Sequence, residues 1–238
     1  MKHLICLPTY NEAENLEPMV RALRALDLDD LHVLVIDDNS PDGTGEIADR
    51  LAGGDDHVHV LHRAEKQGLG PAYLAGFGRA LDLGAERIFE MDCDFSHDPS
   101  DVPRLAAAAD EVDLVLGSRY VQGGGTRNWG VVRRFISRGG SLYAQILLQL
   151  AVRDLTGGFK CYRRQVLERI DLHAISSLGY AFQIETTYRA LRAGFKVVEV
   201  PITFSDREVG GSKMSRAIVL EAVWKVPVLR ARALLGRL

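Results

Sequence analysis

Two aspartates separated by one residue are the part of this 238-residue sequence best suited to chemistry. Asp92 and Asp94 follow residues 85–90, an apolar run that predicts a buried strand leading into a loop. At a strand end, two such carboxylates can flank one hard cation and still leave coordination positions for substrate phosphates. We therefore predict a Mg²⁺ or Mn²⁺ site here. The alternative is that both acids only solvate a turn.

The residues after this pair indicate the start of a helix. Asp98 can cap it, and Pro99 suits a first helical turn. The two aspartates would thus lie in a strand-loop-helix corner, which is where α/β sheets bind ligands. This context favours the cation site over the simple turn.

Strands and helices must alternate to position such a corner. We predict strands at residues 3–7, 31–36, 57–61, 85–90, 113–117 and 196–200, with helices between most of them. This alternation predicts an α/β fold whose central sheet is predominantly parallel, with helices on both faces and a ligand at the carboxyl ends of the strands. The polar turn 37–45 and Arg119 would lie at that same edge. Residues 155–160 are predicted to form a turn and residues 180–193 a helix.

Two common nucleotide-binding motifs are absent from the sequence. The loop after the first strand lacks the Gly-x-Gly-x-x-Gly that a dinucleotide cofactor needs. Gly68 and Gly70 precede a helix, but no Gly-Lys-Ser/Thr follows them, so a plain turn is preferred there.

Charge is divided unevenly along the chain. Residues 1–113 hold 9 Lys/Arg against 24 Asp/Glu, whereas residues 114–238 hold 20 against 8. Residues 114–153 contain six arginines and no acid. The acidic half suits a cation and a hydroxyl-rich ligand, while the arginine stretch suits an anion such as phosphate or a charged membrane face. The alternative is a surface asymmetry without function.

Composition predicts a cytoplasmic globular protein. Hydrophobic residues make up 47% and charged residues 26% of the chain, as in soluble domains. The three cysteines are widely spaced and odd in number, which argues against a disulfide framework or a cysteine zinc site. We find neither a signal peptide nor an uncharged segment of the ~18 residues that a membrane span needs.

Two segments are candidates for a membrane surface. Residues 142–152 are apolar and follow four arginines, and residues 213–238 contain six basic residues together with Trp224. For each segment, a helix that covers the core is an equally good interpretation. Pro227 should kink or end the first helical part of the tail. We expect a catalytic domain at residues 1–212 and a basic amphipathic helical tail at 213–238.

Several motifs extend over nearly the whole chain. They are residues 8–12 (PTYNE), 37–44 (DDNSPDGT), 91–94 (MDCD), 117–120 (GSRY), 135–139 (FISRG), 155–159 (LTGGF), 179–185 (GYAFQIE) and 207–213 (REVGGSK). Together they resemble the polyprenyl (dolichyl) phosphate mannose synthases of glycosyltransferase family 2. The resemblance implies a Rossmann-like GT-A fold and the transfer of mannose from GDP-mannose to a polyprenyl monophosphate, with inversion.

The resemblance also implies site residues. Asp92, Asp94 and Arg119 would be catalytic, with Asp94 as the chief metal ligand and Asp92 and Ser96 beside it. The nucleotide sugar would be held by Pro8, Tyr10, Glu12, Ile36, Asp38, Asp92, Cys93 and Asp94, with Arg119, Arg207 and Lys213 on its phosphates. Arg119, Arg133 and Ser137 would bind the acceptor phosphate. Relatives often carry Gln where this chain has Ser96, which is a shorter ligand.

The chemistry has a physical logic of its own. Family 2 enzymes that act on sugar hydroxyls are expected to carry a Glu-Asp base and a Gln-x-x-Arg-Trp motif, and this sequence has neither. A phosphate monoester is already ionised at neutral pH. Arginines that hold it in line can therefore replace the base.

We expect a peripheral enzyme on the cytoplasmic face of a membrane, bound through its tail, with no nucleic-acid partner. A separate membrane-anchoring subunit is a candidate partner. Two rival functions stay open. One is a synthase that uses UDP-glucose, because a DxD motif contacts metal and diphosphate rather than the base. The other is a noncatalytic subunit that binds nucleotide sugars.

Overall fold

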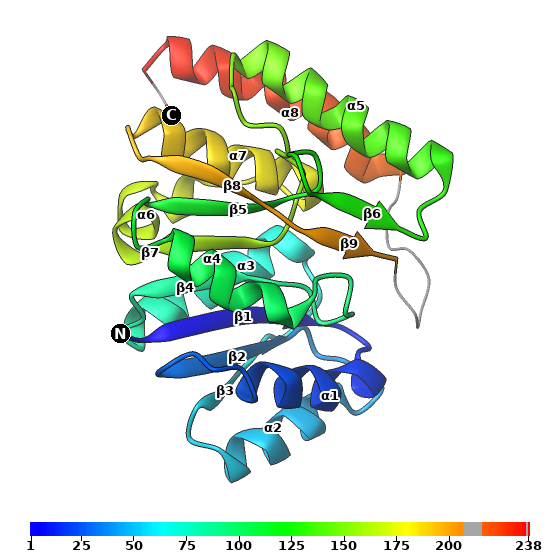
Figure 1. The fold of residues 1–238 in the computed structure, drawn as a ribbon, viewed down its shortest axis with the longest axis vertical. Coiled ribbons are helices and arrows are strands. Elements are labelled where there is room, and N and C mark those ends of the chain that lie inside the picture. The colour runs from blue at the N-terminus through cyan, green and yellow to red at the C-terminus, as the bar shows by residue number, and fades with distance from the viewer. Residues whose placement is uncertain (207–215, 237) are drawn as a thin grey trace.

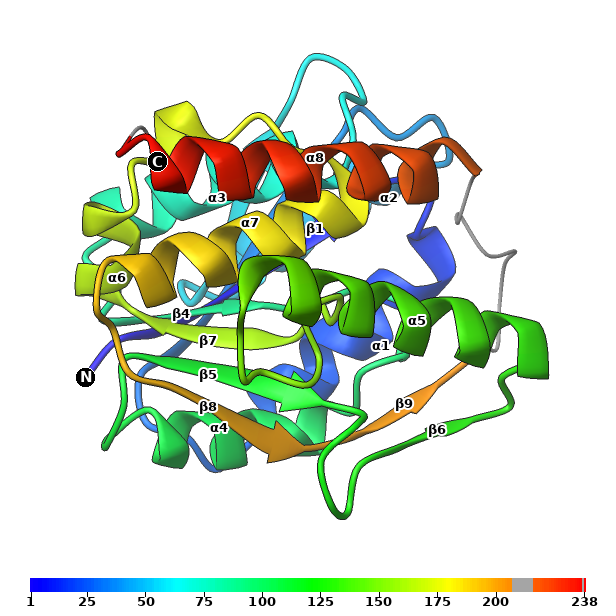
Figure 2. The same cartoon turned by 90° about the horizontal axis from the view of Figure 1, so that it is seen from above.

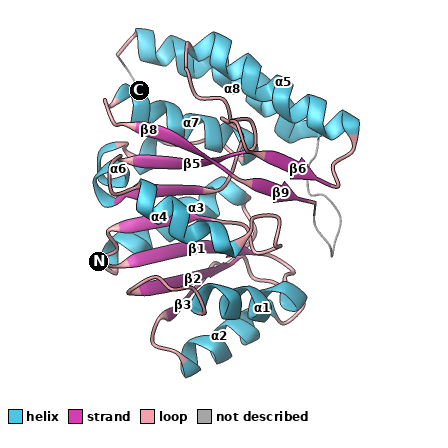
Figure 3. Cartoon of the chain, viewed as in Figure 1, coloured by secondary structure: helices cyan, strands magenta, loops and turns pink. Residues whose placement is uncertain are grey.

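A seven-stranded sheet forms the centre of the molecule (Figures 1 and 3). The computed structural model describes residues 1–206, 216–236 and 238. The strands of the sheet, in their spatial order, are β3 (Val58–His62), β2 (Leu31–Asp37), β1 (His3–Thr9), β4 (Arg87–Glu90), β7 (Lys160–Arg163), β5 (Leu114–Ser118) and β8 (Val197–Pro201). Neighbouring strands are parallel except around β7. The predicted α/β class and predominantly parallel sheet are thus confirmed.

Strand β7 is a correction to the sequence prediction. A turn was expected through Lys160, but this residue begins β7, which is antiparallel to both β4 and β5. Its Lys-Cys-Tyr-Arg sequence shows no apolar alternation. Lys160 is buried as part of an ion pair with Glu90, so a charged residue stands where a hydrophobic one would be expected. A second small sheet was also unpredicted, in which β6 (Gly125–Arg127) pairs in parallel with β9 (Thr203–Ser205).

Helices cover both faces of the central sheet. They are α1 (Ala13–Arg24), α2 (Thr44–Gly54), α3 (Leu69–Asp82), α4 (Val102–Ala108), α5 (Val131–Leu148), α6 (Arg164–Arg169), α7 (Gly179–Arg192) and α8 (Arg216–Leu234), with the short 3₁₀ helices Pro99–Asp101 and Leu172–Ala174. Along β1, Leu4 and Cys6 pack in the core beneath α3 and α7, whereas Ile5 and Leu7 pack in the core beneath α1 and α4. This alternation gives each face its own hydrophobic core.

Helices α5 and α8 lie side by side outside α7 (Figures 1 and 2). Val226, Leu229 and Ala233 of α8 are buried and belong to the core beneath α7. Pro227 lies inside α8, so it does not end the helix. No helix in the described part of the chain is both long and apolar enough to span a bilayer. The boundary predicted after residue 212 falls among residues that are not described.

The polar loops of the chain gather at one edge of the sheet. The loops after β1, β2, β4 and β5 all leave the carboxyl ends of mutually aligned strands. After the β4 loop, Oδ1 of Asp98 accepts a hydrogen bond of 2.9 Å from the backbone N–H of Ser100, and Pro99 starts the 3₁₀ helix that leads into α4. The predicted cap is therefore present.

Candidate active site

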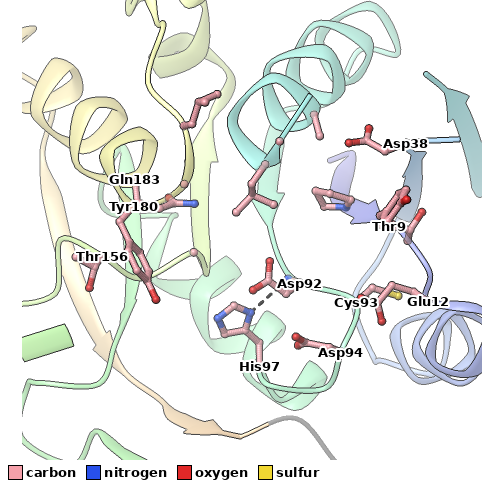
Figure 4. Close-up of a pocket in the computed structure, with 18 of the residues that line it drawn as sticks. Thr9, Glu12, Asp38, Asp92, Cys93, Asp94, His97, Thr156, Tyr180 and Gln183 are labelled. Atoms are coloured by element: carbon pink, nitrogen blue, oxygen red, sulfur yellow. Dashed lines mark hydrogen bonds between the residues drawn. The ribbon is translucent and has the colours of Figure 1, made fainter. Parts of the chain in front are cut away.

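The loops at the carboxyl edge surround one cavity of about 390 Å³ (Figure 4). Nine residues expected at the site line it: Pro8, Tyr10, Glu12, Asp38, Asp92, Cys93, Asp94, Arg119 and Arg133. The cavity thus brings carboxylates from the acidic half of the sequence and guanidinium groups from the basic half to one place.

The acidic loop after β4 is organised by contacts within itself. Asp94 is 5% exposed, and its Oδ1 accepts hydrogen bonds from the backbone N–H (3.0 Å) and the Oγ–H (2.5 Å) of Ser96. Phe95 reverses the chain between them with a φ of 57°. The backbone N–H of Asp92 donates to Nδ1 of His97 at 3.3 Å. These contacts join near neighbours, so the loop sequence itself orients its carboxylates.

One end of the cavity lies at the loops after β1 and β2. Oδ1 of Asp38 accepts a hydrogen bond of 2.5 Å from Arg63. Burial raises the pKa of Asp38, and the charge of Arg63 opposes that rise. Nζ of Lys66 lies 3.8 Å from the centre of the Tyr10 ring. This end combines an aromatic face with polar groups, which suits a nucleoside.

Arg119 is fixed within the opposite wall. Its Nε and Nη2 donate to the two carboxylate oxygens of Asp154 at 2.7 and 2.6 Å, and Nη2 also donates to Thr156 at 2.9 Å. Arg119 is 6% exposed and Asp154 is 1% exposed. Burial lowers the pKa of Arg119, but the charge of Asp154 and the hydrogen bonds to it together raise this pKa above its usual value. The guanidinium therefore stays charged and rigidly oriented.

Arg133 enters the same wall from the first turn of α5. Its guanidinium lies 4.4 Å from the ring centre of Trp129 and forms an ion pair with Asp206. Nε of Arg133 and Nε1 of Trp129 are buried and have no hydrogen-bond partner among the described residues. The wall thus contains donors that a bound anion could use.

A buried ion pair lies beneath the cavity. Nζ of Lys160 is 3.6 Å from Oε2 of Glu90, and both side chains are at most 1% exposed. Burial lowers the pKa of Lys160 to about 8, against the opposing charge of Glu90. Burial likewise raises the pKa of Glu90. Oε1 of Glu90 accepts a hydrogen bond from Gln183, which lines the cavity.

Three of the remaining expected residues lie outside the cavity lining, and two are not described. Ser96 does not line the cavity, and its hydroxyl supports Asp94. Ile36 is fully buried in β2 and does not line the cavity either. Ser137 also lies outside the lining, where its Oγ accepts a hydrogen bond of 2.8 Å from the Tyr120 hydroxyl. Arg207 and Lys213 lie outside the described residues.

Several lining residues were not expected from the sequence. Among them are His97, Trp129, Thr156, Tyr180, Gln183 and Phe204. Thr156 lies in the LTGGF motif, while Tyr180 and Gln183 lie in the GYAFQIE motif, so the resemblance had singled out their segments without giving them a role. Asp154, the partner of Arg119, immediately precedes LTGGF. No local pattern marks Trp129 or Phe204, because they reach the site through the unpredicted β6 and β9 segments.

A predominantly parallel α/β sheet with an acidic loop at the carboxyl end of a central strand is the architecture of a GT-A glycosyltransferase. Comparison with solved structures agrees with this class. The structure of glucosyl-3-phosphoglycerate synthase from Mycobacterium tuberculosis, in complex with Mn²⁺, UDP-glucose and phosphoglyceric acid, superposes with a TM-score of 0.71. The match covers 97% of this chain and 80% of that chain at 18% identity, which shows a shared fold.

Sequence comparison establishes the family. Residues 4–171 match the model of glycosyl transferase family 2. The chain is 50% identical to a polyprenol monophosphomannose synthase from Mycolicibacterium smegmatis, over 98% of this chain and 89% of that protein. It is 51% identical to an undecaprenyl-phosphate mannosyltransferase from Micrococcus luteus, over 95% of this chain and 93% of that protein. The chain therefore belongs to glycosyl transferase family 2.

Proposed function

We propose that this enzyme transfers mannose from GDP-mannose to a polyprenyl monophosphate, with inversion at the anomeric carbon. The observation that carries the proposal is the shared cavity, in which Asp92 and Asp94 face the same space as Arg119 and Arg133. The names of the two curated relatives include the same sugar and the same class of acceptor. An ionised phosphate needs arginines rather than a carboxylate base, and arginines form this wall.

In this proposal, the donor extends along the cavity from the Asp38 end. Pro8, Tyr10, Glu12 and Asp38 would hold the nucleoside, with the backbone around Ile36 beneath it. The diphosphate would lie at the acidic loop near Cys93, where Arg207 and Lys213 are the further cations proposed to bind it. The sugar would then extend past Asp92 toward α7.

Asp94 and Asp92 are proposed to hold a Mg²⁺ or Mn²⁺ ion. They supply the oxygen donors that such cations prefer, and both line the cavity. When bound, the cation would neutralise the charge that develops on the leaving diphosphate. The two hydrogen bonds from Ser96 keep Asp94 ready for this role. Ser96 as a direct ligand stays a prediction.

The arginines are proposed to deliver the acceptor. Arg119, fixed by Asp154, and Arg133, stacked on Trp129, would hold the phosphate against the anomeric carbon. A phosphate oxygen then forms the new bond on one face of that carbon while the bond to GDP breaks on the other, which inverts the configuration. No proton has to be removed from the acceptor, so the orientation of the phosphate is the main contribution of these residues.

The lipid acceptor also requires contact with a membrane, and we assign that contact to α5 and α8. The α5–α8 apolar face consists of exposed hydrophobic side chains on both helices and in the turn that follows α8: Val131, Phe135, Leu142, Ile146, Leu220, Val223, Trp224, Leu234 and Leu235. Phe135 is 79% exposed and Trp224 is 74% exposed. Arg134 and Arg138 on α5 are exposed as well. Apolar side chains flanked by cations suit an anionic membrane surface.

Both α5 and the tail helix α8 are proposed to contact the membrane. Helix α8 buries one side in the protein core and exposes another, and α5 does the same through buried Ala144 and Leu148. Arg133 and Ser137 are carried by α5, so binding of this helix to a membrane would bring the phosphate-binding wall to the lipid headgroups. The enzyme would then be peripheral to its membrane.

The central experiment measures transfer of labelled mannose from GDP-mannose into a polyprenyl phosphate, with and without a metal chelator. We expect a lipid product whose formation stops with chelator and resumes with excess Mg²⁺ or Mn²⁺. Binding of GDP-mannose with no transfer under any condition would instead favour the noncatalytic subunit.

The sugar donor is tested by measuring GDP-mannose and UDP-glucose separately. One solved structure with this fold holds UDP-glucose and another holds GDP-mannose, so the fold alone does not select one base or sugar. We therefore expect GDP-mannose, but not UDP-glucose, to raise the melting temperature in the presence of Mg²⁺ and to support transfer. Transfer of glucose from UDP-glucose at the greater rate would replace the proposed donor.

A further inference from the structure

Gln183 is a buried amide with one half of its hydrogen-bonding capacity unused. The side chain lines the cavity and the residue is 2% exposed. Its Nε2 donates to Oε1 of Glu90 at 3.1 Å. Its Oε1 is buried and has no hydrogen-bond partner within residues 1–206, 216–236 and 238. Such an oxygen is costly to leave unpaired, which points to a ligand that donates a hydrogen bond to it.

Glu90 determines which atom of the amide is left for the ligand. The carboxylate of Glu90 accepts a hydrogen bond of 2.8 Å from Tyr162, and Lys160 lies 3.6 Å from it. Each oxygen of the Glu90 carboxylate accepts a hydrogen bond, one from the Tyr162 hydroxyl and the other from the Gln183 amide nitrogen. A reversed Gln183 amide would place two oxygens against each other. The amide N–H₂ therefore faces Glu90, and the acceptor oxygen is the atom that stays available.

The backbone around Gln183 is built to keep this amide in place. Nζ of Lys160 donates to the main-chain oxygen of Gln183 at 2.9 Å. Gly158, which also lines the cavity, faces the amide so closely that an added Cβ would lie 3.3 Å from Nε2. A side chain at position 158 would crowd the amide. The first contact fixes the main chain at Gln183, and the second leaves room for its amide.

The position of Gln183 identifies the part of the donor that it can reach. Gln183 lies across the cavity from Asp38, with Asp92 between them (Figure 4). With the nucleoside at the Asp38 end and the diphosphate at the acidic loop, the transferred sugar occupies the Gln183 end. We propose that Oε1 of Gln183 accepts a hydrogen bond from one hydroxyl of the transferred sugar, and that Glu90 is the positioning residue that orients the amide. This inference rests on the proposed function.

The test compares donor analogues by calorimetry with Mg²⁺ and without acceptor. The ligands are GDP, GDP-mannose and the four GDP-mannose analogues that each lack the hydroxyl at C2, C3, C4 or C6. For the wild-type protein, we expect one analogue to bind about tenfold more weakly than GDP-mannose. For Gln183→Leu, we expect GDP-mannose to bind about as weakly as that analogue, the analogue to lose no further affinity, and GDP to bind as before.

A matched control is Gln165→Leu. Gln165 is another glutamine whose amide donates to a carboxylate, that of Asp113, but it lies outside the cavity lining. This variant should bind every ligand like the wild type. Glu90→Gln should lose the discrimination between GDP-mannose and the analogue while keeping its affinity for GDP, whereas a purely structural role of Glu90 would weaken both ligands together.

Failure of the Gln183 proposal can be told apart from failure of the proposed function. If the wild-type protein binds GDP-mannose and all four analogues equally, no sugar hydroxyl is recognised and the role of Gln183 is overturned, without any need for a variant to fold. Equal weakening of GDP and GDP-mannose in Gln183→Leu also overturns it. If the wild-type protein transfers no mannose from GDP-mannose to a polyprenyl phosphate in the central experiment, the proposed function fails, and this inference fails with it.

Discussion

The cavity has an acidic wall, formed by Asp92 and Asp94, and a basic wall, formed by Arg119 and Arg133. The two walls are held in place in different ways. The acidic wall depends on short-range contacts, since Asp94 is oriented by Ser96 two positions away. The basic wall depends on long-range contacts: Arg119 pairs with Asp154, 35 positions away, and Arg133 pairs with Asp206, 73 positions away. The proposed cation site can therefore be encoded in one loop, whereas the proposed anion site forms only when distant segments meet.

Burial explains part of this difference. A buried guanidinium is stable only when a carboxylate pairs with it, and the acid-free stretch at residues 114–153 contains no such group. Arg119 must take its partner from outside that stretch, and it pairs with Asp154, the first acid that follows. The acidic half has no such need, because a turn can supply N–H and hydroxyl donors to its own carboxylates.

The largest effect should come from breaking the acidic wall. Asp94→Asn keeps the shape of the side chain but removes its charge, and we expect transfer to fall by roughly 10³-fold because the cation loses its main ligand. Rates at saturating GDP-mannose and Mn²⁺ measure the effect. Asp98→Asn, a neighbouring exposed aspartate that caps the following helix, is the control and should retain most activity. Near-normal transfer by Asp94→Asn would refute the metal assignment.

Breaking the basic wall should produce a different defect. Arg133→Ala should lower transfer by about 10²-fold while leaving the affinity for GDP-mannose unchanged, because this guanidinium is assigned to the acceptor phosphate. Calorimetry with the donor and steady-state kinetics with varied polyprenyl phosphate separate the two steps. The neighbouring exposed Arg134 provides the matched variant Arg134→Ala. An equal loss in both variants would argue for a general charge effect instead of a defined phosphate site.

The acidic and basic halves of the chain are also expected to differ in membrane contact, because only the basic half is proposed to bind a membrane. Phe135→Glu combined with Trp224→Glu should weaken binding to anionic vesicles by about tenfold or more, because two large apolar side chains no longer enter the lipid. Sedimentation with vesicles measures this binding, and transfer to a short, water-soluble acceptor should be nearly unchanged. Val198→Glu, at an exposed position on β8, is the control. Unaltered vesicle binding by the double variant would exclude the α5–α8 apolar face as the contact.

The smallest expected effect concerns acid stability in the first half of the chain. Burial lowers the pKa of His32 and of His59. The unfolded chain then takes up protons at a higher pH than the folded chain does, so the free energy of unfolding should decline as the pH falls below about 6.5. His32→Asn should make this decline shallower in urea titrations between about pH 7 and pH 5. His173→Asn, at an exposed histidine, should not alter the slope.

Much of the fold could be predicted because it depends on local patterns. The strands containing Leu4–Leu7 and Val33–Ile36 are continuous apolar runs, as expected for parallel strands buried on both faces. β7 was missed because its burial is secured by polar partners, with Lys160 bonded to the main chain of Gln183 and to Thr186. Segments β6 and β9 were missed because three-residue strands leave no periodicity to detect.

Core packing, one of the two interpretations of the apolar helices, is confirmed for one side of each helix, and membrane contact by the other side stays a prediction. Each of α5 and α8 has hydrophobic side chains in the core and others in solvent: Ala144 is fully buried while Phe135 is exposed, and Val226 is fully buried while Trp224 is exposed. A helix that is apolar around much of its circumference can meet two apolar environments. The sequence pattern alone cannot say which side meets which.

The amino-acid sequence by itself determined the α/β alternation, the acidic loop with its internal hydrogen bonds and the family of the enzyme, since these follow from residues that are near neighbours or from motifs in fixed order. Tertiary structure alone decided that Asp154 holds Arg119, that Glu90 leaves the oxygen of Gln183 available, and which sides of α5 and α8 face outward. Those outcomes require groups from distant positions to be buried together, and a buried polar group takes the partner that the fold provides.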